Sequence, residues 1–223
     1  MSPRSPRSTN PLCAVVLWLA ACASAPPAPS SAPAEPHTRY RAGDFIVYRY
    51  RGAFTPAPVE LREEVRAQEG ERLRIDVTLS TAGARSRWIQ VLTDTPENQR
   101  DNVIDALYEV VDGRPVRLEN PDNRDAFRLY EKTLIMPEGR ATDVREAHCQ
   151  RAIGDRDYAC TCTSGKNSWR GRAILFEVSR CEGFLWTHGP SRFWDAATGE
   201  DLHVTEVTAV GRDASAAPAP LVP

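Results

Sequence analysis

The stretch "VELREEVRAQEGERLRIDVTLS", residues Val59 to Ser80, carries the clearest secondary-structure pattern in the chain. Apolar residues recur on both sides of Gly70 with a period of two, at Val59, Leu61, Val65 and Ala67 and then at Leu73, Ile75, Val77 and Leu79. This period is typical of a β-strand with one buried face. We therefore predict an antiparallel hairpin around Gly70, in which Ala67 lies opposite Leu73 so that the two apolar faces coincide.

Strand patterns of the same kind extend in both directions from this hairpin. Alternating or β-rich segments, separated by turns with Gly, Asp and Asn, occupy residues 44–51, 87–93, 144–153, 158–163, 169–178 and 202–210. The segment 95–120 is ambiguous, because Val103, Leu107 and Val110 have helical spacing whereas Asp112-Gly113 is typical of a hairpin turn. We favour a hairpin that is preceded by a helical turn.

One substantial helix is predicted between Asp122 and Leu134. Asn120 can cap it, Pro121 suits its first position, and Pro137 stops it. The strand-rich regions on both sides of this helix favour an α+β fold that is mainly antiparallel β. We expect a curved sheet or partly open barrel with the helix against its concave face.

Composition divides the chain into four parts. We expect a lipoprotein signal peptide at residues 1–21, a lipid anchor and Ala/Pro/Ser-rich linker at residues 22–37, a single β-rich domain at residues 38–212, and a disordered tail at residues 213–223. The linker is rich in proline and poor in large apolar side chains, so it should act as an extended spacer.

The N-terminal part has the layout of a secretory signal. Arg4 and Arg7 precede the apolar run "LCAVVLWLAA", which is too short to span a membrane, since a spanning helix needs about 20 apolar residues. The sequence LAAC at residues 19–22 resembles the lipobox of bacterial lipoproteins, in which the cysteine is lipidated and becomes the mature N-terminus. The alternatives are an ordinary cleavable signal, because residues 21–23 fit a small-x-small cleavage site, and an uncleaved anchor.

The lipobox resemblance implies a location as well as an anchor. Several acyl chains on Cys22, palmitate among them, would hold the protein at a membrane, because each buried methylene contributes about 0.8 kcal/mol. Ala23 stands where an aspartate would signal inner-membrane retention, which favours the outer membrane with the domain facing the periplasm. The segments "YRAGDFIVYRYRG" and "GEDLHVTEVTAVGR" are similar to uncharacterised β-rich envelope lipoproteins with a half-barrel like the lipoprotein localisation factors.

Four cysteines remain after the signal peptide and the lipobox are set aside. An even number of cysteines in an exported domain predicts disulfides. A hairpin with its turn at residues 155–156 places Cys149 across from Cys162, and the next strand brings Cys181 to the end of the hairpin that carries Cys160. We therefore predict the pairs Cys149–Cys162 and Cys160–Cys181.

A zinc site is the alternative use of these cysteines, with His148 or His188 as a further ligand. Because Cys-x-Cys is not the usual Cys-x-x-Cys spacing, we predict no metal. The acidic loops "GDRD", "DNRD" and "DAATGED" miss the calcium-loop pattern and are typical of solvated turns. We expect no other cofactor.

Catalytic and nucleic-acid-binding motifs are not found in the sequence. "TSGKNS" lacks the residues of a phosphate loop, and "GPSRF" around Ser191 lacks the second glycine of a nucleophile elbow. His188 precedes a Gly-Pro turn and is the best candidate for a catalytic base, but no polar cluster accompanies it, so we assign no catalytic residue. The formal net charge is −2 and the arginines are scattered, which argues against nucleic-acid binding.

The stretch "CEGFLWTHGPSRFWD" concentrates aromatic residues around a Gly-Pro turn. Such rings are usually core residues, but two aromatic strands that close on a turn can also form the wall of an apolar cavity. The candidate ligand-binding residues are Phe184, Trp186, Phe193 and Trp194.

These patterns predict a binding protein rather than an enzyme. We expect a lipid-anchored module of the bacterial envelope, attached to a membrane and non-catalytic, that binds a lipid or another apolar ligand. A structural or assembly role with an envelope protein as partner is the alternative, and a hydrolytic enzyme is the second alternative.

Overall fold

The computed structural model describes residues 40–101, 103–118, 133, 135, 137–154, 156–185 and 188–223. These residues belong to one compact unit, Glu35–Pro223. The predicted signal peptide, Cys22 and the linker lie outside the described residues. A search of the described residues finds no helix that is long and apolar enough to cross a membrane.

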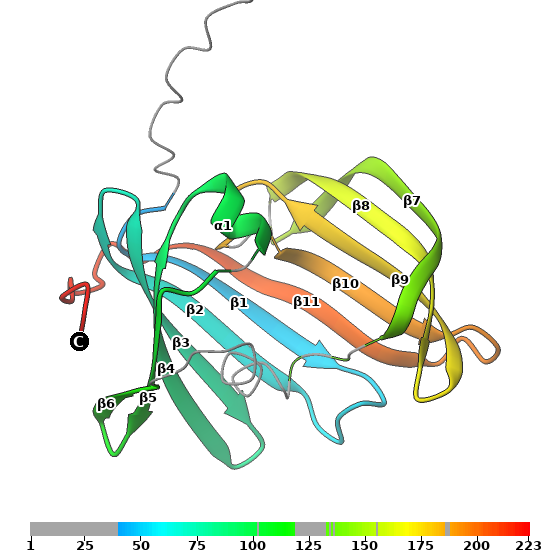
Figure 1. Cartoon of the computed structure of the whole chain (residues 1–223), viewed down its shortest axis with the longest axis horizontal. Coiled ribbons are helices and arrows are strands. Elements are labelled where there is room, and N and C mark those ends of the chain that lie inside the picture. Colours follow the sequence, from blue (N-terminus) through cyan, green and yellow to red (C-terminus); the bar gives the residue numbers. More distant parts are fainter. Residues whose placement is uncertain are drawn as a thin grey trace, which may run out of the picture. The chain divides into compact units, whose positions relative to one another are not determined.

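Eleven antiparallel strands form one open sheet (Figure 1). In chain order they are β1 (Asp44–Arg51), β2 (Val59–Glu69), β3 (Arg72–Thr81), β4 (Ala84–Thr93), β5 (Ala106–Val111), β6 (Arg114–Arg117), β7 (Glu138–Ile153), β8 (Arg156–Trp169), β9 (Arg172–Cys181), β10 (His188–Asp195) and β11 (Asp201–Arg212). Their order across the sheet is β6-β5-β4-β3-β2-β1-β11-β10-β9-β8-β7. The pairing of β1 with β11 joins the two ends of the domain, and β6 and β7 form the two edges.

The predicted α+β fold class is wrong, because the described residues are almost entirely β. Their one α-helix is α1 (Pro96–Asp101), which has six residues. The segment Asp122–Leu134, where the sequence predicts a substantial helix, lies outside the described residues apart from Thr133. Capping residues indicate where a helix can begin, but they do not decide whether it forms against the tertiary packing. The expected hairpin at residues 112–113 is confirmed, since β5 pairs with β6 directly after α1.

The predicted register of the β2–β3 hairpin is confirmed from Glu60 to Val65 and wrong between Arg66 and the turn, where Ala67 lies opposite Arg74. Its turn has two residues, and Gly70 supplies the left-handed φ of 61°. A β-bulge at Arg66 then realigns the strands, so that Val65 lies opposite Ile75. Beyond the bulge, Ala67 joins the cluster on the other face of the sheet rather than the main core.

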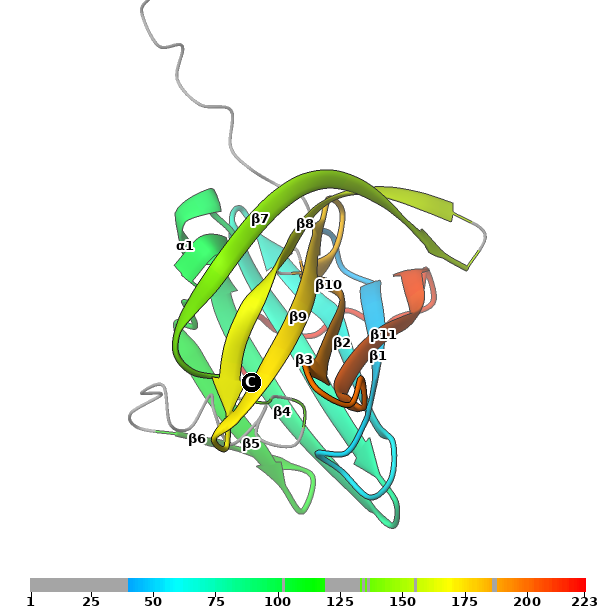
Figure 2. The ribbon, with the colours of Figure 1, turned by 90° about the vertical axis from the view of Figure 1, so that its right-hand side faces the viewer.

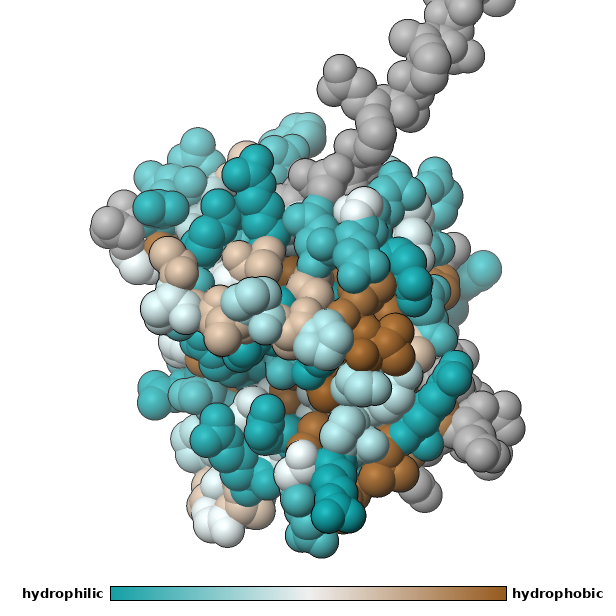
Figure 3. Space-filling model, turned by 90° about the vertical axis from the view of Figure 1, so that its left-hand side faces the viewer, coloured by the Kyte–Doolittle hydropathy of each residue, from teal (hydrophilic) through white to brown (hydrophobic). Residues whose placement is uncertain are grey.

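Apolar residues are buried on both faces of the sheet. The main core is built on β1 to β5 and extends to the ends of β8 and β9; its largest fully buried members are Phe184, Ile46, Leu61, Leu73, Ile75, Leu92 and Leu107. The opposite face of β2 to β5 carries a smaller cluster of Ala67, Ile89, Val91, Ala106, Tyr108 and Leu221. On the side of the molecule shown in Figure 3, apolar residues gather near the middle and polar residues surround them.

The sheet is strongly twisted, and the β7–β8 hairpin arches over the strands beside it (Figure 2). As a result β7 approaches β11, although three strands separate the two in the sheet. Strong twist is expected for a long two-stranded ribbon at the edge of a sheet. This arch creates the pockets described below.

Residues 213–223, whose composition predicts disorder, lie along the face that carries the smaller cluster. The Ala219 N–H donates to the main-chain carbonyl of Arg66 at 3.1 Å. Leu221 is only 5% exposed. One buried leucine and a few main-chain hydrogen bonds therefore hold a segment whose composition is otherwise typical of disorder.

Candidate binding site

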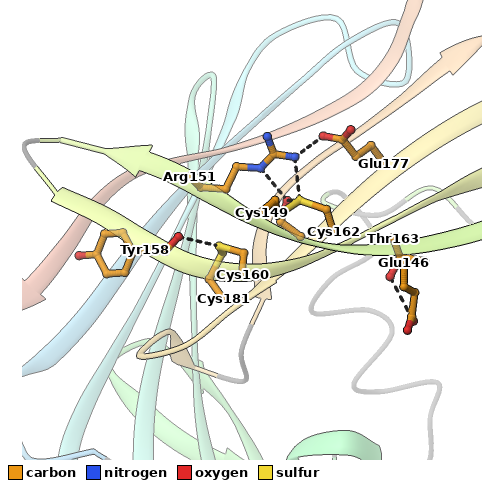
Figure 4. The surroundings of a disulfide bond; sticks show 10 residues. Glu146, Cys149, Arg151, Tyr158, Cys160, Cys162, Thr163, Glu177 and Cys181 are labelled. Atoms are coloured by element: carbon orange, nitrogen blue, oxygen red, sulfur yellow. Dashed lines mark hydrogen bonds and ion pairs between the residues drawn. A yellow bond between two sulfur atoms is a disulfide. The ribbon is translucent and has the colours of Figure 1, made fainter.

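Two disulfides tie the β7–β8 hairpin together and to β9 (Figure 4). Cys149 is bonded to Cys162 and Cys160 to Cys181, which confirms the predicted pairs. The predicted register is wrong, because a two-residue turn places Cys149 opposite Cys160. The Cys149–Cys162 bond is therefore diagonal, with 5.9 Å between its Cα atoms, whereas the Cys160–Cys181 bond joins opposed residues at 4.0 Å.

Arg151 lies beside the diagonal disulfide and reaches across β8 to β9 (Figure 4). Its guanidinium donates to Cys162 Sγ at 3.0 Å, to Ser179 Oγ at 2.9 Å and to the Glu177 carboxylate. These contacts hold the hairpin in its curled position in addition to the covalent bonds.

The curled hairpin leaves a pocket on each side where it meets β11. The β8 pocket has a volume of about 330 Å³ and is lined by Tyr40, Asp44, Phe45, Arg156, Tyr158, Gly183, Leu185, Val210, Gly211 and Arg212. The β7 pocket has a volume of about 390 Å³ and is lined by Arg151, Ala152, Ile153, Glu177, Pro190, Ser191, Arg192, Val204, Thr205, Glu206 and Val207. Both volumes lie at the lower end of the range of about 300–1,000 Å³ that is usual for ligand sites.

Most of the lining of the β8 pocket is apolar, and two of its aromatic rings are held in place. The Tyr40 hydroxyl donates to the main-chain carbonyl of Phe184. The ring of Tyr158 packs edge-on against the ring of Phe184, with 4.8 Å between the centroids. Phe184 therefore acts as a buried support for both rings, and its neighbour Leu185 lines the pocket.

Charged residues of the β8 pocket leave an excess of one positive charge. Arg212 donates from Nε to Asp44 Oδ1 at 2.6 Å, and this carboxylate raises the pKa of the Arg212 guanidinium. Because the side chain of Arg212 is 47% exposed, the pair contributes little to stability. Arg156, at the exposed start of β8, adds a second cation.

The β7 pocket has a different character, because its charged residues already form ion pairs. Arg151 pairs with Glu177, Arg192 Nε lies 2.6 Å from an Asp201 oxygen, and Glu206 accepts from Arg51 at 2.8 Å. A pocket walled by satisfied ion pairs favours water over an apolar ligand. The β8 pocket is therefore the better candidate binding site.

The four aromatic residues chosen from the sequence do not form one cluster. Phe184 is fully buried in the main core. Phe193 packs in a separate small core with Ile174, and its neighbour Trp194 points to the opposite face, where the Arg192 guanidinium lies 4.9 Å from the ring centroid. Trp186 lies outside the described residues. The lining of the β8 pocket includes none of these four residues.

A buried polar cluster lies on the main-core side of the sheet. Tyr50, Glu63 and His203 are 6%, 3% and 2% exposed, and His203 Nε2 lies 2.7 Å from the main-chain oxygen of Thr133. Burial, and then the charge of Glu63, raise the pKa of Tyr50 well above 10. Burial also lowers the pKa of His203, whose Nδ1 has no hydrogen-bond partner among the described residues.

The sequence patterns did not predict this polar cluster, although one residue in them indicates it. Glu63 occupies the apolar phase of its strand, between Leu61 and Val65, and a charged residue at a buried phase needs a buried partner. The cluster lines neither pocket, so it has no route to a substrate through them.

The alternative sites from the sequence gain no support. All four cysteines of the zinc alternative are in disulfides, and the described residues contain no group of three or more potential metal ligands. His148 is exposed on β7, and the side chain of His188 is outside what the structure describes.

Comparison with known proteins gives only distant similarities. No family model matches the chain, and no curated protein matches it. Similar solved structures include MucB (15% identity, TM-score 0.40, 80% of this chain and 56% of that chain) and MucB in complex with MucA(peri) (15%, 0.38, 77% and 51%). A third is described as an exported protein with a YmcC-like fold from Bacteroides fragilis (9%, 0.38, 77% and 97%). The chain spans about half the length of the two MucB chains.

Proposed function

We propose that this protein is a lipid-anchored, non-catalytic binding module of the bacterial cell envelope, and that its β8 pocket takes the acyl chain of an anionic amphiphile. The observation that carries the proposal is the lining of this pocket. Apolar side chains from four separate segments converge there, namely Tyr40, Phe45, Tyr158, Leu185 and Val210, beside the cations Arg156 and Arg212.

The chemistry of the pocket suits a ligand with two different ends. A hydrocarbon chain gains free energy from burial, at about 25 cal/mol per Å² of apolar surface removed from water. An anionic head group gains from Arg156, because Arg212 is already engaged by Asp44. At about 330 Å³ the pocket would hold part of a chain, with the head group at the solvent side.

The anchor and the location belong to the same proposal. Acyl chains on Cys22 would keep the domain at the outer membrane, and residues 23–37 would give it reach toward ligands in that membrane. A Cys22→Ser chain is expected to move from the detergent phase to the aqueous phase in a phase-partitioning experiment; unchanged partitioning would contradict the anchor.

A pocket-filling substitution tests the ligand site without disturbing the core. A Cβ atom on Gly211 would meet the Phe45 ring at 3.5 Å, which is ordinary contact, and Gly211 has no left-handed φ. Gly211→Val therefore fits the strand and occupies pocket space. In the Cys22→Ser background, we expect it to weaken binding of a fluorescent C16 fatty acid about tenfold, as measured by titration below the critical micelle concentration.

Two controls sharpen this experiment. Thr208→Val replaces a hydroxyl by a methyl group at an exposed position of the same strand. The hydrogen bond that it removes, from Thr208 Oγ1 to the Val47 carbonyl, lies outside both pockets, so binding should not change. Arg156→Glu should weaken binding of the C16 fatty acid but not of a neutral C16 alcohol. If Gly211→Val leaves the affinity unchanged while the protein stays folded, the β8 pocket does not bind the chain.

A further inference from the structure

The face of β2 to β5 that lies opposite the main core carries an apolar groove, and the tail of the chain fills it. The groove is formed by Ala67, Ile89, Val91, Ala106 and Tyr108, which are between 1% and 9% exposed with the tail in place. Leu221 is the one tail residue that is fully buried against them; the neighbouring Val222 is 50% exposed. The tail is therefore anchored by a single side chain.

Polar groups beside this groove bind the main chain of the tail. The carbonyl of Arg66, the bulge residue of β2, accepts from the Ala219 N–H at 3.1 Å. The Arg66 guanidinium donates to the Ala217 carbonyl at 2.8 Å, and the Arg74 guanidinium donates to the Pro220 carbonyl at 2.9 Å. A bulge leaves main-chain groups out of the sheet ladder, which explains why the Arg66 carbonyl can accept from the tail.

These contacts recognise an extended backbone and hardly any side chains. Pro218 and Pro220 have no N–H to satisfy and favour an extended conformation, while Ala219 between them supplies the one donor that the groove needs. The required pattern is thus an extended x-Pro-x-Pro segment followed by an apolar residue. Nothing in the contacts is peculiar to this chain's own tail.

We propose that this groove is a docking site for an extended, proline-containing segment of a partner protein, and that residues 216–221 occupy it in cis as a competing plug. The tail is suited to exchange, because its alanine and proline side chains bury little and its anchor is one leucine. A partner with the same spacing and a larger apolar surface displaces it. This inference does not depend on the β8 pocket, which is lined by a different set of residues.

A peptide-binding experiment on the full chain tests the proposal, with the Cys22→Ser substitution for solubility. The probe is a fluorescein-labelled peptide with the sequence of residues 213–223, measured by fluorescence anisotropy. Leu221→Asp removes the anchor of the cis tail, so this chain should bind the probe at least tenfold more tightly than the chain with Leu221. In the chain that keeps Leu221, the cis tail competes with the probe at a high effective concentration.

Matched variants separate docking from non-specific effects. Val222→Asp adds the same charge at the neighbouring exposed position, so its probe affinity should equal that of the unaltered tail. A probe that carries Asp at the position of Leu221 should not bind, whereas a probe with Asp at the position of Val222 should. If Leu221→Asp prevents folding, Leu221→Ser replaces it. The proposal is overturned if all folded chains bind the probe with equal affinity. It is also overturned if analytical sedimentation shows a dimer that forms by exchange of tails.

Discussion

The strands β1 to β5 and the β7–β8 hairpin belong to the same sheet, but different interactions hold them. β3 buries its apolar residues on alternate positions against the main core, with Ile75 only 1% exposed. Along β7, by contrast, Ile153 is the one buried residue, at the very end of the strand. Two disulfides and the contacts of Arg151 attach this hairpin instead.

Hydrophobic burial and covalent links therefore stabilise different parts of this fold. A strand with two exposed faces cannot stabilise itself by burial. The β7–β8 hairpin nevertheless arches over its neighbours, and β7 lines one pocket while β8 lines the other. Cross-links fix such a strand without an apolar face. The candidate binding site therefore lies where the disulfide-linked hairpin meets the edge of the main core.

The largest expected effect concerns the main core. Ile75→Ala should lower the free energy of unfolding by about 4 kcal/mol, because it removes methylenes from a fully buried site and leaves a cavity. Val144→Ala, on β7 and with 51% of its side chain exposed, should change it by less than about 0.5 kcal/mol. Urea unfolding measures both. Similar losses for the two would contradict the comparison.

A smaller and more local effect is expected from the disulfides. Each closes a loop of modest length, with separations of 13 and 21 residues, which corresponds to about 3 kcal/mol of unfolded-state entropy. Replacing Cys160 and Cys181 by Ala should cost more than replacing Cys149 and Cys162, because Cys160 and Cys181 lie in the main core.

Hydrogen exchange locates the loss of each disulfide. We expect faster exchange in β7 and β8 and little change in β2 and β3. Uniformly faster exchange across the sheet would show that the hairpin and the core unfold as one unit, which would contradict a separate attachment of the hairpin.

A still smaller effect is expected in the pH dependence of the free energy of unfolding, and it arises from a buried residue of the core. Burial lowers the pKa of His203 below its usual 6.5, so the unfolded chain takes up a proton at this group at a higher pH than the folded protein does. The contribution of neutral His203 to stability is complete above about pH 6.5 and is lost as the pH falls from there toward the folded pKa.

The substitution His203→Phe removes the titrating imidazole and keeps an aromatic ring at this position. The variant should show a shallower loss of stability than the unaltered protein between pH 7.5 and 5.5 in thermal unfolding, while hydrogen exchange in β7 should not respond to pH through this group. Identical slopes for the two proteins would mean that His203 stays neutral in both states over this range.

Local patterns predicted the strands well and the contacts between strands less well. The period of two located β2 and β3, because it reflects one buried face and nothing else. The disulfide partners followed from the number of cysteines and the proximity of the strands. The predicted register of the β7–β8 hairpin was nevertheless wrong, because the composition of the turn does not fix its position to a single residue. The sequence did not show that Glu63 and His203 are both buried beside Tyr50, because the three residues come from different strands.

The sequence alone was enough to predict many antiparallel strands and two disulfides, because alternation and cysteine number are local properties that hold in any arrangement of the strands. It was not enough to exclude the substantial helix that it also predicted. Three features depend on how the strands pack together. The aromatic residues separate onto different faces, residues 213–223 lie against the smaller apolar cluster, and Tyr40, Tyr158 and Val210 line the β8 pocket. These features join segments more than 50 residues apart, and the twist of the sheet, which depends on all strands together, brings them into contact.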